Sequence, residues 1–118
     1  MTAFGAIQSA LSHLNVPCVP GTYEGTAQTY ITYNYALLRG ADFGDNAPAC
    51  DVADVQIHYF TPCRDPQTHR QTNFNTIRKE IRDSLFAAGF TYPTVEVIEE
   101  RDESIAIWHL VFECQYEE

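Results

Sequence analysis

An apolar stripe in the second half of the chain constrains the fold more than any other sequence feature. Its members recur at intervals of three and four residues, the spacing that places side chains on one face of an α-helix. Thr72 or Asn73 can cap the start of this helix, and Gly89 stands where helices commonly end in a left-handed residue. The pattern therefore predicts a helix over residues 73–88 with one buried face. The stripe consists of Phe74, Ile77, Ile81 and Leu85.

The rest of the chain supplies a second helix and the strands on which these helices can pack. Apolar residues at helical spacing predict a helix over residues 3–14, with Thr2 as its N-cap. Alternation of apolar and polar residues predicts half-buried strands, with a tight turn at residues 101–104. The expected strands are residues 29–38, 52–61, 94–100 and 104–116.

These elements predict a single α+β domain spanning residues 1–118. Two helices packed on one face of a four-stranded mixed or antiparallel sheet would bury every apolar stripe. The helix over 73–88 would serve as the crossover to the final hairpin. Polar stretches with Gly or Pro predict three loops. They are residues 15–29, with a short extended piece at Val16–Val19, a long loop at 39–51 between the first two strands, and residues 62–71.

The charge of the chain limits its partners. The chain has 118 residues and a net charge of −9, which argues against nucleic-acid binding through counterion release. The start of the sequence lacks the basic segment and continuous apolar core of a signal peptide. No apolar run approaches the ~20 residues of a membrane span. We therefore expect a protein made in the cytosol that binds no membrane.

The cysteines give no sign of a metal site. None belongs to a Cys-x-x-Cys pair, and no histidine stands at zinc-finger spacing. We expect them to be reduced and to pack as small apolar side chains, and no cofactor is predicted. The four cysteines are Cys18, Cys50, Cys63 and Cys114.

Catalytic motifs are missing from the sequence. The chain contains no GxSxG, phosphate-binding loop, HExxH or GxGxxG. The one candidate for acid–base chemistry is a group of His58, His109 and Glu113, which would meet if their strands were neighbours. Cross-strand polar pairing on a sheet face accounts for these residues more simply. Because nothing supplies a nucleophile or an oxyanion site, the chain is not expected to be an enzyme.

Charged and apolar clusters indicate a subunit interface instead. Arg78, Lys79 and Arg82 lie on the polar side of the predicted helix, either as a solvated face or as a contact with an acidic neighbour. Ile107 and Val111 lie on the second face of the last strand, and the aromatic residues exceed what a small core can hold. A sheet that is apolar on both faces, with helices on only one, needs a partner. The acidic candidates are Asp42 and Asp45 in the long loop and Glu99 and Glu100 near the last hairpin.

Four motifs together are typical of one known family. They are a strand ending in tyrosines, an acidic Asp-Asn step in a polar loop, a strand of the Val-Gln-Val-His type, and a helix ending in Leu-x-x-Ala-Gly-Phe. In this chain they are Tyr30–Tyr35, Asp45–Asn46, Val55–Phe60 and Leu85–Phe90. From about Tyr30 to its C-terminus the chain resembles the tail-completion, or tail-terminator, proteins of long-tailed phages and prophages, and its first helix fits as well.

The resemblance implies a structural role in the virion. Proteins of this family form a ring, usually a hexamer, at the head-proximal end of the tail tube. The ring stops tube polymerisation and provides a surface for head–tail joining. The implied partners are other copies of the chain, the tail tube protein and the head–tail connector, while DNA passes through without being bound. An acidic lumen suits this passage because it repels a polyanion.

Two other functions stay open on the sequence alone. One is a small cytosolic acid–base enzyme that uses His58, His109 and Glu113. The other is a neighbouring head–tail joining component of the neck. Assembly into a ring separates the structural role from the enzyme, and the position of the chain in the particle separates the two neck proteins.

Overall fold

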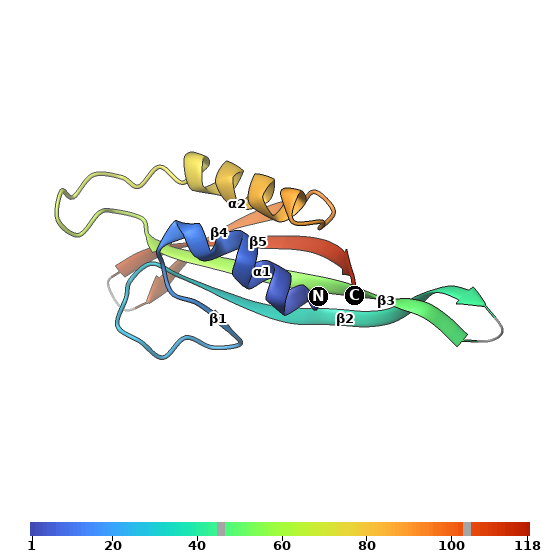
Figure 1. Ribbon diagram of the computed structural model, residues 1–118. Helices are drawn as coiled ribbons and strands as arrows, with labels where there is room; N and C mark the ends of the chain where they lie inside the picture. Colours follow the sequence, from blue (N-terminus) through green and yellow to red (C-terminus); the bar gives the residue numbers. More distant parts are fainter. Residues whose placement is uncertain (45–46, 103–104) are drawn as a thin grey trace.

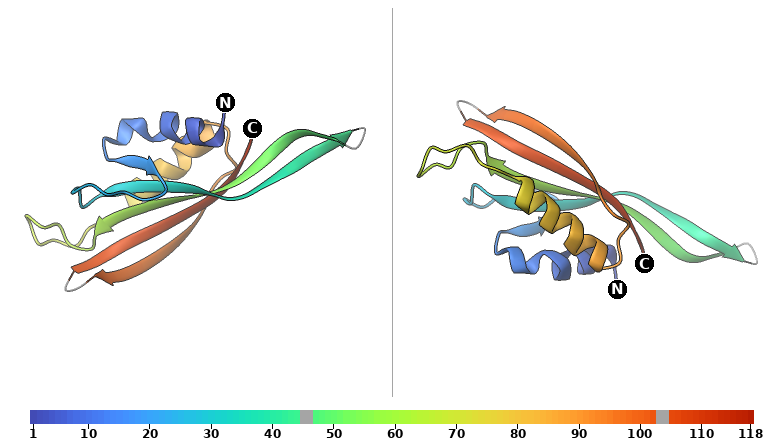
Figure 2. Two further views of the ribbon diagram at one scale, coloured as in Figure 1. Left: turned by 90° about the horizontal axis from the view of Figure 1, so that it is seen from below. Right: turned by 90° about the horizontal axis from the view of Figure 1, so that it is seen from above.

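The computed structural model describes residues 1–44, 47–102 and 105–118. Two α-helices lie on the same face of a five-stranded sheet (Figures 1 and 2). The sheet order is β1-β2-β3-β5-β4; β1 is parallel to β2, and the other neighbours are antiparallel. The elements are α1 (Ala3–Leu11), the 3-10 turn η1 (Ser12–Leu14), β1 (Cys18–Pro20), β2 (Tyr30–Gly44), β3 (Ala47–Pro62), α2 (Asn75–Ala87), β4 (Thr94–Asp102) and β5 (Ile105–Glu117).

Both helices begin close to the predicted residues, α1 at the N-cap Thr2 and α2 after Phe74, which makes no side-chain cap of its own. The Thr2 hydroxyl accepts a hydrogen bond from Gly5 N at 3.1 Å at the start of α1. The Asn73 side-chain oxygen accepts one from Asn75 N at 3.0 Å at the start of α2. Gly89, just beyond α2, has a φ of 105°, which glycine adopts without strain. Among the described residues, no helix is long and apolar enough to cross a membrane.

The core lies between the two helices and the sheet. Ile81 and Leu85 of α2 are fully buried, as the helical spacing predicts. Each strand contributes every second residue to this face, and burying one such side chain contributes about 1.5–3 kcal/mol. The central strand residues of the core are Ile31, Tyr33, Val55, Ile57, Tyr59, Leu110, Phe112 and Cys114.

The sheet has five strands rather than the four predicted. The short extended piece expected at Val16–Val19 is β1, which pairs in parallel with the start of β2. Gly21 N donates to Tyr33 O at 2.9 Å beside this pairing. So short a segment offers too few residues for an alternating pattern to show in the sequence.

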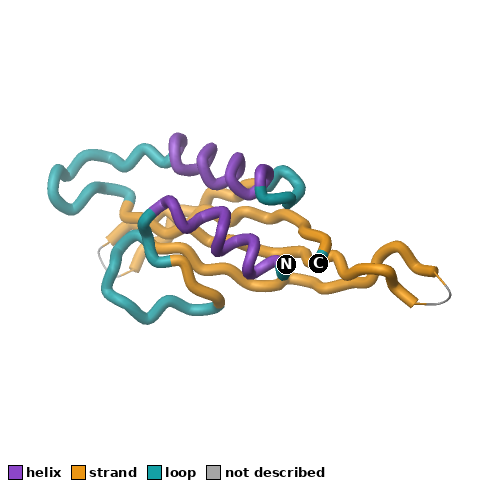
Figure 3. Tube along the Cα trace, viewed as in Figure 1, coloured by secondary structure: helices purple, strands orange, loops and turns teal. Residues whose placement is uncertain are grey.

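The long loop predicted at residues 39–51 is wrong. β2 and β3 continue through residues 39–44 and 47–51 as a two-stranded ribbon, with Arg39 opposite Val52, and the ribbon projects beyond the rest of the sheet (Figure 3). Gly, Asp and Pro are poor strand residues, so the composition indicated a loop. The ladder nevertheless continues past a bulge between Tyr35 and Leu37. The molecule is therefore elongated, with extents of 60 × 26 × 22 Å.

Candidate functional site

A row of polar side chains crosses four strands on the sheet face opposite the helices. Asn34 of β2 lies next to His58 of β3, with 2.9 Å between Asn34 Oδ1 and His58 Nε2. His58 Nδ1 lies 2.8 Å from His109 Nε2 on β5. His109 Nδ1 lies 2.8 Å from Glu100 Oε1 on β4. These contacts define the polar row: Asn34, His58, His109 and Glu100.

The amide of Asn34 sets the proton positions along the polar row. Asn34 Nδ2 donates to Gln56 Oε1 at 3.3 Å, so Asn34 Oδ1 is left to accept from His58 Nε2. His58 Nδ1 is then an acceptor, and His109 donates to it from Nε2. The other nitrogen of His109 donates to the Glu100 carboxylate. In this arrangement the acceptor at His58 Nδ1 requires the neutral form of His58.

The surroundings of His58 favour its neutral form. Burial lowers the pKa of His58 below the ordinary 6.5, and the neighbouring His109 lowers it further, while Glu100 and Glu113 act in the opposite direction. The sequence grouped Glu113 with the two histidines, but Glu113 is not the carboxylate that contacts His109. Glu113 accepts a hydrogen bond from Gln56 Nε2 at 3.2 Å, and Glu100 is the carboxylate bonded to His109.

Sequence reasoning missed Asn34 and Glu100 as members of the row. The available signal was the phase of β4, which places Glu96, Ile98 and Glu100 on the same face as His109. A shared face implies contact between Glu100 and His109 only if β4 and β5 are neighbours, and the sequence alone does not give the strand order. The two histidines were found because His58 lies in the polar phase of its strand and His109 on the second face of the last strand.

Stacked aromatic rings cover one side of the polar row. The Phe60 ring centre lies 4.2 Å from that of His109 and 4.8 Å from that of Tyr30. Val111, on the same face, is only 7% exposed, and Ile107 is half-buried. The subunit therefore packs some of these aromatic rings against one another on this face, and the expectation that a partner covers the face stays a prediction.

A cavity of about 590 Å³ lies at one end of the sheet. Its lining includes Arg64, Asp65 and Trp108, and it contains neither His58 nor His109. A substrate held in this cavity would not contact the histidine pair. The cavity and the polar row are separate features.

The predicted basic stripe of α2 is partly engaged within the subunit. Lys79 Nζ lies 2.6 Å from Asp83 Oδ2. Arg82 Nε donates to Pro93 O at 2.9 Å, and its guanidinium carbon lies 4.4 Å from the centre of the Tyr92 ring. Within the described part of the chain the ion pairs do not include Arg78. Arg78 is thus the member of the stripe whose charge is most available to a neighbour.

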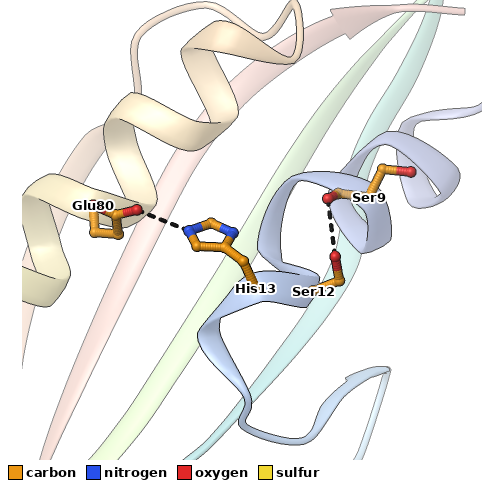
Figure 4. A network of polar contacts seen from close by, with 4 residues as sticks. All are labelled: Ser9, Ser12, His13 and Glu80. Atoms are coloured by element: carbon orange, nitrogen blue, oxygen red, sulfur yellow. Dashed lines mark hydrogen bonds and ion pairs between the residues drawn. The ribbon is translucent and has the colours of Figure 1, made fainter.

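A separate histidine–carboxylate contact joins the two helices. His13 Nε2 lies 2.8 Å from Glu80 Oε1 (Figure 4). Nearby, the Ser12 hydroxyl donates to Ser9 O at 3.3 Å. The side chains of His13 and Glu80 are 49% and 52% exposed, so this pair contributes only about 0–1 kcal/mol.

The acidic interface candidates belong to two distant parts of the molecule. Glu99 is exposed on β4, and Glu100 on the same strand is bonded to His109. Asp42 belongs to β2 in the projecting ribbon, which extends away from the ends of β4 and β5 that pair at Asp102 and Ile105 (Figure 1). The Asp42 side chain and the whole of Asp45 lie outside the described residues.

The described cysteines are free thiols with low reactivity. Burial raises the pKa of Cys18 to about 11 and that of Cys114 to about 12, so both stay protonated near neutral pH. Cys63 is also free and buried, and the side chain of Cys50 lies outside the described residues. Among the described residues, no cluster of three His, Cys, Asp or Glu side chains could hold a metal ion.

Comparison with solved structures finds a distant likeness. A chain of the virion of a native gene transfer agent (GTA) particle matches with a TM-score of 0.47 and 16% sequence identity, covering 98% of this chain and 95% of that chain. No family model matches the sequence, and no curated protein is similar to it. At this identity and TM-score, the likeness assigns neither a family nor a function.

Proposed function

We propose that the chain is a structural subunit of a phage tail, a tail-completion protein that forms a ring at the head-proximal end of the tail tube. The observation that carries the proposal is the β2–β3 ribbon, which projects from the sheet in a molecule 60 Å long. A two-stranded ribbon is marginally stable in water by itself. A ribbon of this kind is stabilised when it packs against a neighbouring subunit.

The sequence motifs that resemble the tail-completion family belong to the scaffold of this fold. Val55–Phe60 is the central part of β3, and Leu85–Phe90 is the end of α2 with its glycine cap. Both segments contribute to the core. The resemblance therefore rests on residues that determine how the sheet and the helix pack, which supports a shared architecture and a non-enzymatic role.

The ring would meet three kinds of partner. Copies of the chain contact one another side by side, the tail tube protein contacts one surface of the ring, and the head–tail connector contacts the opposite surface. A hexamer is the expected ring size. The net charge of −9 per chain suits a lumen through which DNA passes without binding. The subunit would be made in the host bacterial cytoplasm and end in the virion.

An acid–base enzyme is the second candidate, because the polar row contains a bonded pair of histidines. In that row both nitrogens of His58 and both nitrogens of His109 are engaged by protein atoms. A general base needs a nitrogen within hydrogen-bond reach of its substrate. The row is better suited to holding four strands in register than to transferring a proton to a ligand.

Assembly of tail tubes in vitro tests the proposed role. The tube protein of the same phage or prophage would be polymerised with and without this chain, and the products examined by electron microscopy. We expect short tubes that carry a ring at one end when the chain is present. Tubes of unchanged length with bare ends would contradict the proposal, and a ring that binds the connector but not the tube would favour another neck component.

A further inference from the structure

The sheet has two unpaired edges on opposite sides. Within the described residues no strand pairs with the outer side of β4. On the other side, β1 pairs with β2 from Ile31 to Tyr33, and no strand of the described ranges pairs with the outer side of the rest of β2. Unpaired edges offer backbone donors and acceptors to another chain.

The outward-facing backbone groups of β4 follow from its pairing with β5. Thr91 N donates to Gln115 O at 3.0 Å, so Gln115 turns its backbone toward the β4 side. Successive residues of a strand point their backbone N–H and C=O groups to opposite sides of that strand. Every second residue of β5, counted back from Gln115, therefore forms backbone hydrogen bonds with its register partner on β4. The residues of β4 between these partners turn their N–H and C=O groups outward. They are Val95, Val97 and Glu99.

The same reasoning identifies the outward-facing groups of β2. Glu118 N donates to Asp51 O at 2.9 Å. The backbone groups of Asp51 therefore point toward β5, and those of the next residue, Val52, point toward β2. Val52 is the register partner of Arg39, which therefore bonds to β3. The neighbours of Arg39 on β2 turn outward. They are Leu38 and Gly40.

Exposed apolar side chains lie on matching faces of these two edges. Leu38 is 50% exposed and Val97 is 42% exposed. Leu38 pairs with Ala53, and Val97 pairs with Leu110. Both of those partners are buried on the helix-covered face of the sheet. Joining the edges in one continuous sheet would therefore place Leu38 and Val97 side by side.

The two edges also differ in charge. Residues 94–102 contain four carboxylates and one arginine, a net charge of −3, whereas Arg39 is the one charged residue in the stretch Leu37–Gly40. Two β4 edges would repel each other, because like charges opposite one another destabilise a strand pair. The β2 edge offers a cation, Arg39, whose Nε also lies 3.8 Å from Asp54 Oδ2 on β3, and each copy of the chain carries both edges.

We propose that the outer edge of β2, residues Leu37–Gly40, pairs with the outer edge of β4, Val95–Ile98, in a second copy of this chain, with Leu38 opposite Val97. Within one sheet β2 and β4 run in opposite directions. Copies related by rotation about an axis along the strands would therefore pair these edges antiparallel.

This register gives each side chain a suitable partner. With Leu38 opposite Val97, the apolar Leu37 faces Ile98 and the cation of Arg39 faces Glu96. A shift by two residues in either direction places Arg39 opposite Ile98 or Thr94 instead. Cross-strand apolar and opposite-charge pairs each contribute about 0.2–1 kcal/mol. The pairing is heterologous, so repetition closes a ring or extends a filament; the inference rests on the proposed function for closure into a ring.

Proline at the outward-facing positions tests the pairing. Leu38→Pro and Val97→Pro each remove a backbone N–H that points away from the subunit and leave the internal ladder intact. Sedimentation velocity would be measured from about 1 μM to about 1 mM, the range in which weak association becomes visible. We expect the wild-type chain to associate and each proline variant to do so at least about tenfold more weakly. Leu38→Ala and Val97→Ala keep the N–H and are the matched controls.

Mixing the two proline variants distinguishes this contact from a symmetric one. The Leu38→Pro chain keeps its β4 edge and the Val97→Pro chain keeps its β2 edge, so an equimolar mixture should form heterodimers and nothing larger. A mixture that stays monomeric would overturn the inference. Proline variants that assemble like the wild type would overturn it too, while leaving the proposed ring in place with another interface. A wild-type chain that stays monomeric throughout would overturn the pairing as a contact of the free protein, and tube assembly would then test the proposed function separately.

A charge exchange keeps the test decisive where a proline variant fails to fold. Arg39→Glu and Glu96→Arg should each weaken self-association, because each places like charges opposite one another in the proposed register. The double variant should restore it. Equal association of all four proteins, with unchanged circular dichroism, would rule out this register.

Discussion

His58 and His109 face each other across β3 and β5, with 2.8 Å between His58 Nδ1 and His109 Nε2. His58 accepts this hydrogen bond in its neutral form. Protonation of His58 would remove the acceptor and place a positive charge beside the ring of His109. The pair therefore makes the sheet sensitive to acid.

The pH dependence of stability should reveal this pair. The pKa of His58 is lowered in the folded chain by burial and by His109. As pH falls below 6.5, the ordinary value, the unfolded chain binds a proton that the folded chain does not, so the free energy of unfolding decreases. The free energy of unfolding continues to decrease until the pH falls below the pKa of His58 in the folded chain. Urea unfolding from pH 8 to pH 5 measures it.

Two variants isolate the contribution of His58. His58→Gln should flatten the dependence between pH 6.5 and pH 5, because the titrating group is gone. His69→Asn is the control, since His69 is exposed in a loop with a φ of 60° that asparagine tolerates. An unchanged slope in His58→Gln would show that another group carries the acid sensitivity.

The buried stripe of α2 should dominate the stability of the domain. Ile81 is fully buried in the core, so Ile81→Ala should lower the free energy of unfolding by about 2–5 kcal/mol. Phe86→Ala on the same helix is the control, because Phe86 is 59% exposed. Similar losses in the two variants, measured by urea unfolding, would be incompatible with this orientation of α2.

The sequence predicted the parts of the fold that local patterns determine. Helical spacing located both helices, and the cap residues Thr2 and Gly89 marked where α1 begins and α2 ends. Alternation located β4, β5 and the parts of β2 and β3 that lie outside the projecting ribbon. These features depend on neighbours along the chain, which the sequence shows directly.

The features that the sequence could not show depend on strand register. The projecting ribbon contains residues with poor strand propensity, and cross-strand hydrogen bonds maintain it against that preference. Glu100 bonds to His109 because β4 neighbours β5, a relation that no local pattern records. The engagement of Arg82 by Tyr92 and Pro93 likewise depends on how the chain turns after α2.

The basic stripe should separate into a structural arginine and an interface arginine. Arg82→Glu should lower the free energy of unfolding by about 1–2 kcal/mol, because it removes the contact with the Tyr92 ring and the hydrogen bond to Pro93 O. Arg78→Glu should leave thermal unfolding nearly unchanged and weaken ring formation, more strongly at low salt. Full assembly of the folded Arg78→Glu chain on tail tubes would remove the stripe from the proposed interface.

The length of the tails made without this protein tests the central claim most directly. The gene would be deleted from the phage or prophage that encodes the chain, and tail lengths and head attachment would be measured by electron microscopy. We predict overlong tails that are not joined to heads, and recovery of joined tails of normal length when the wild-type chain is supplied. Tails of normal length joined to heads in the deletion strain would contradict the assignment of this chain as the subunit that terminates the tail.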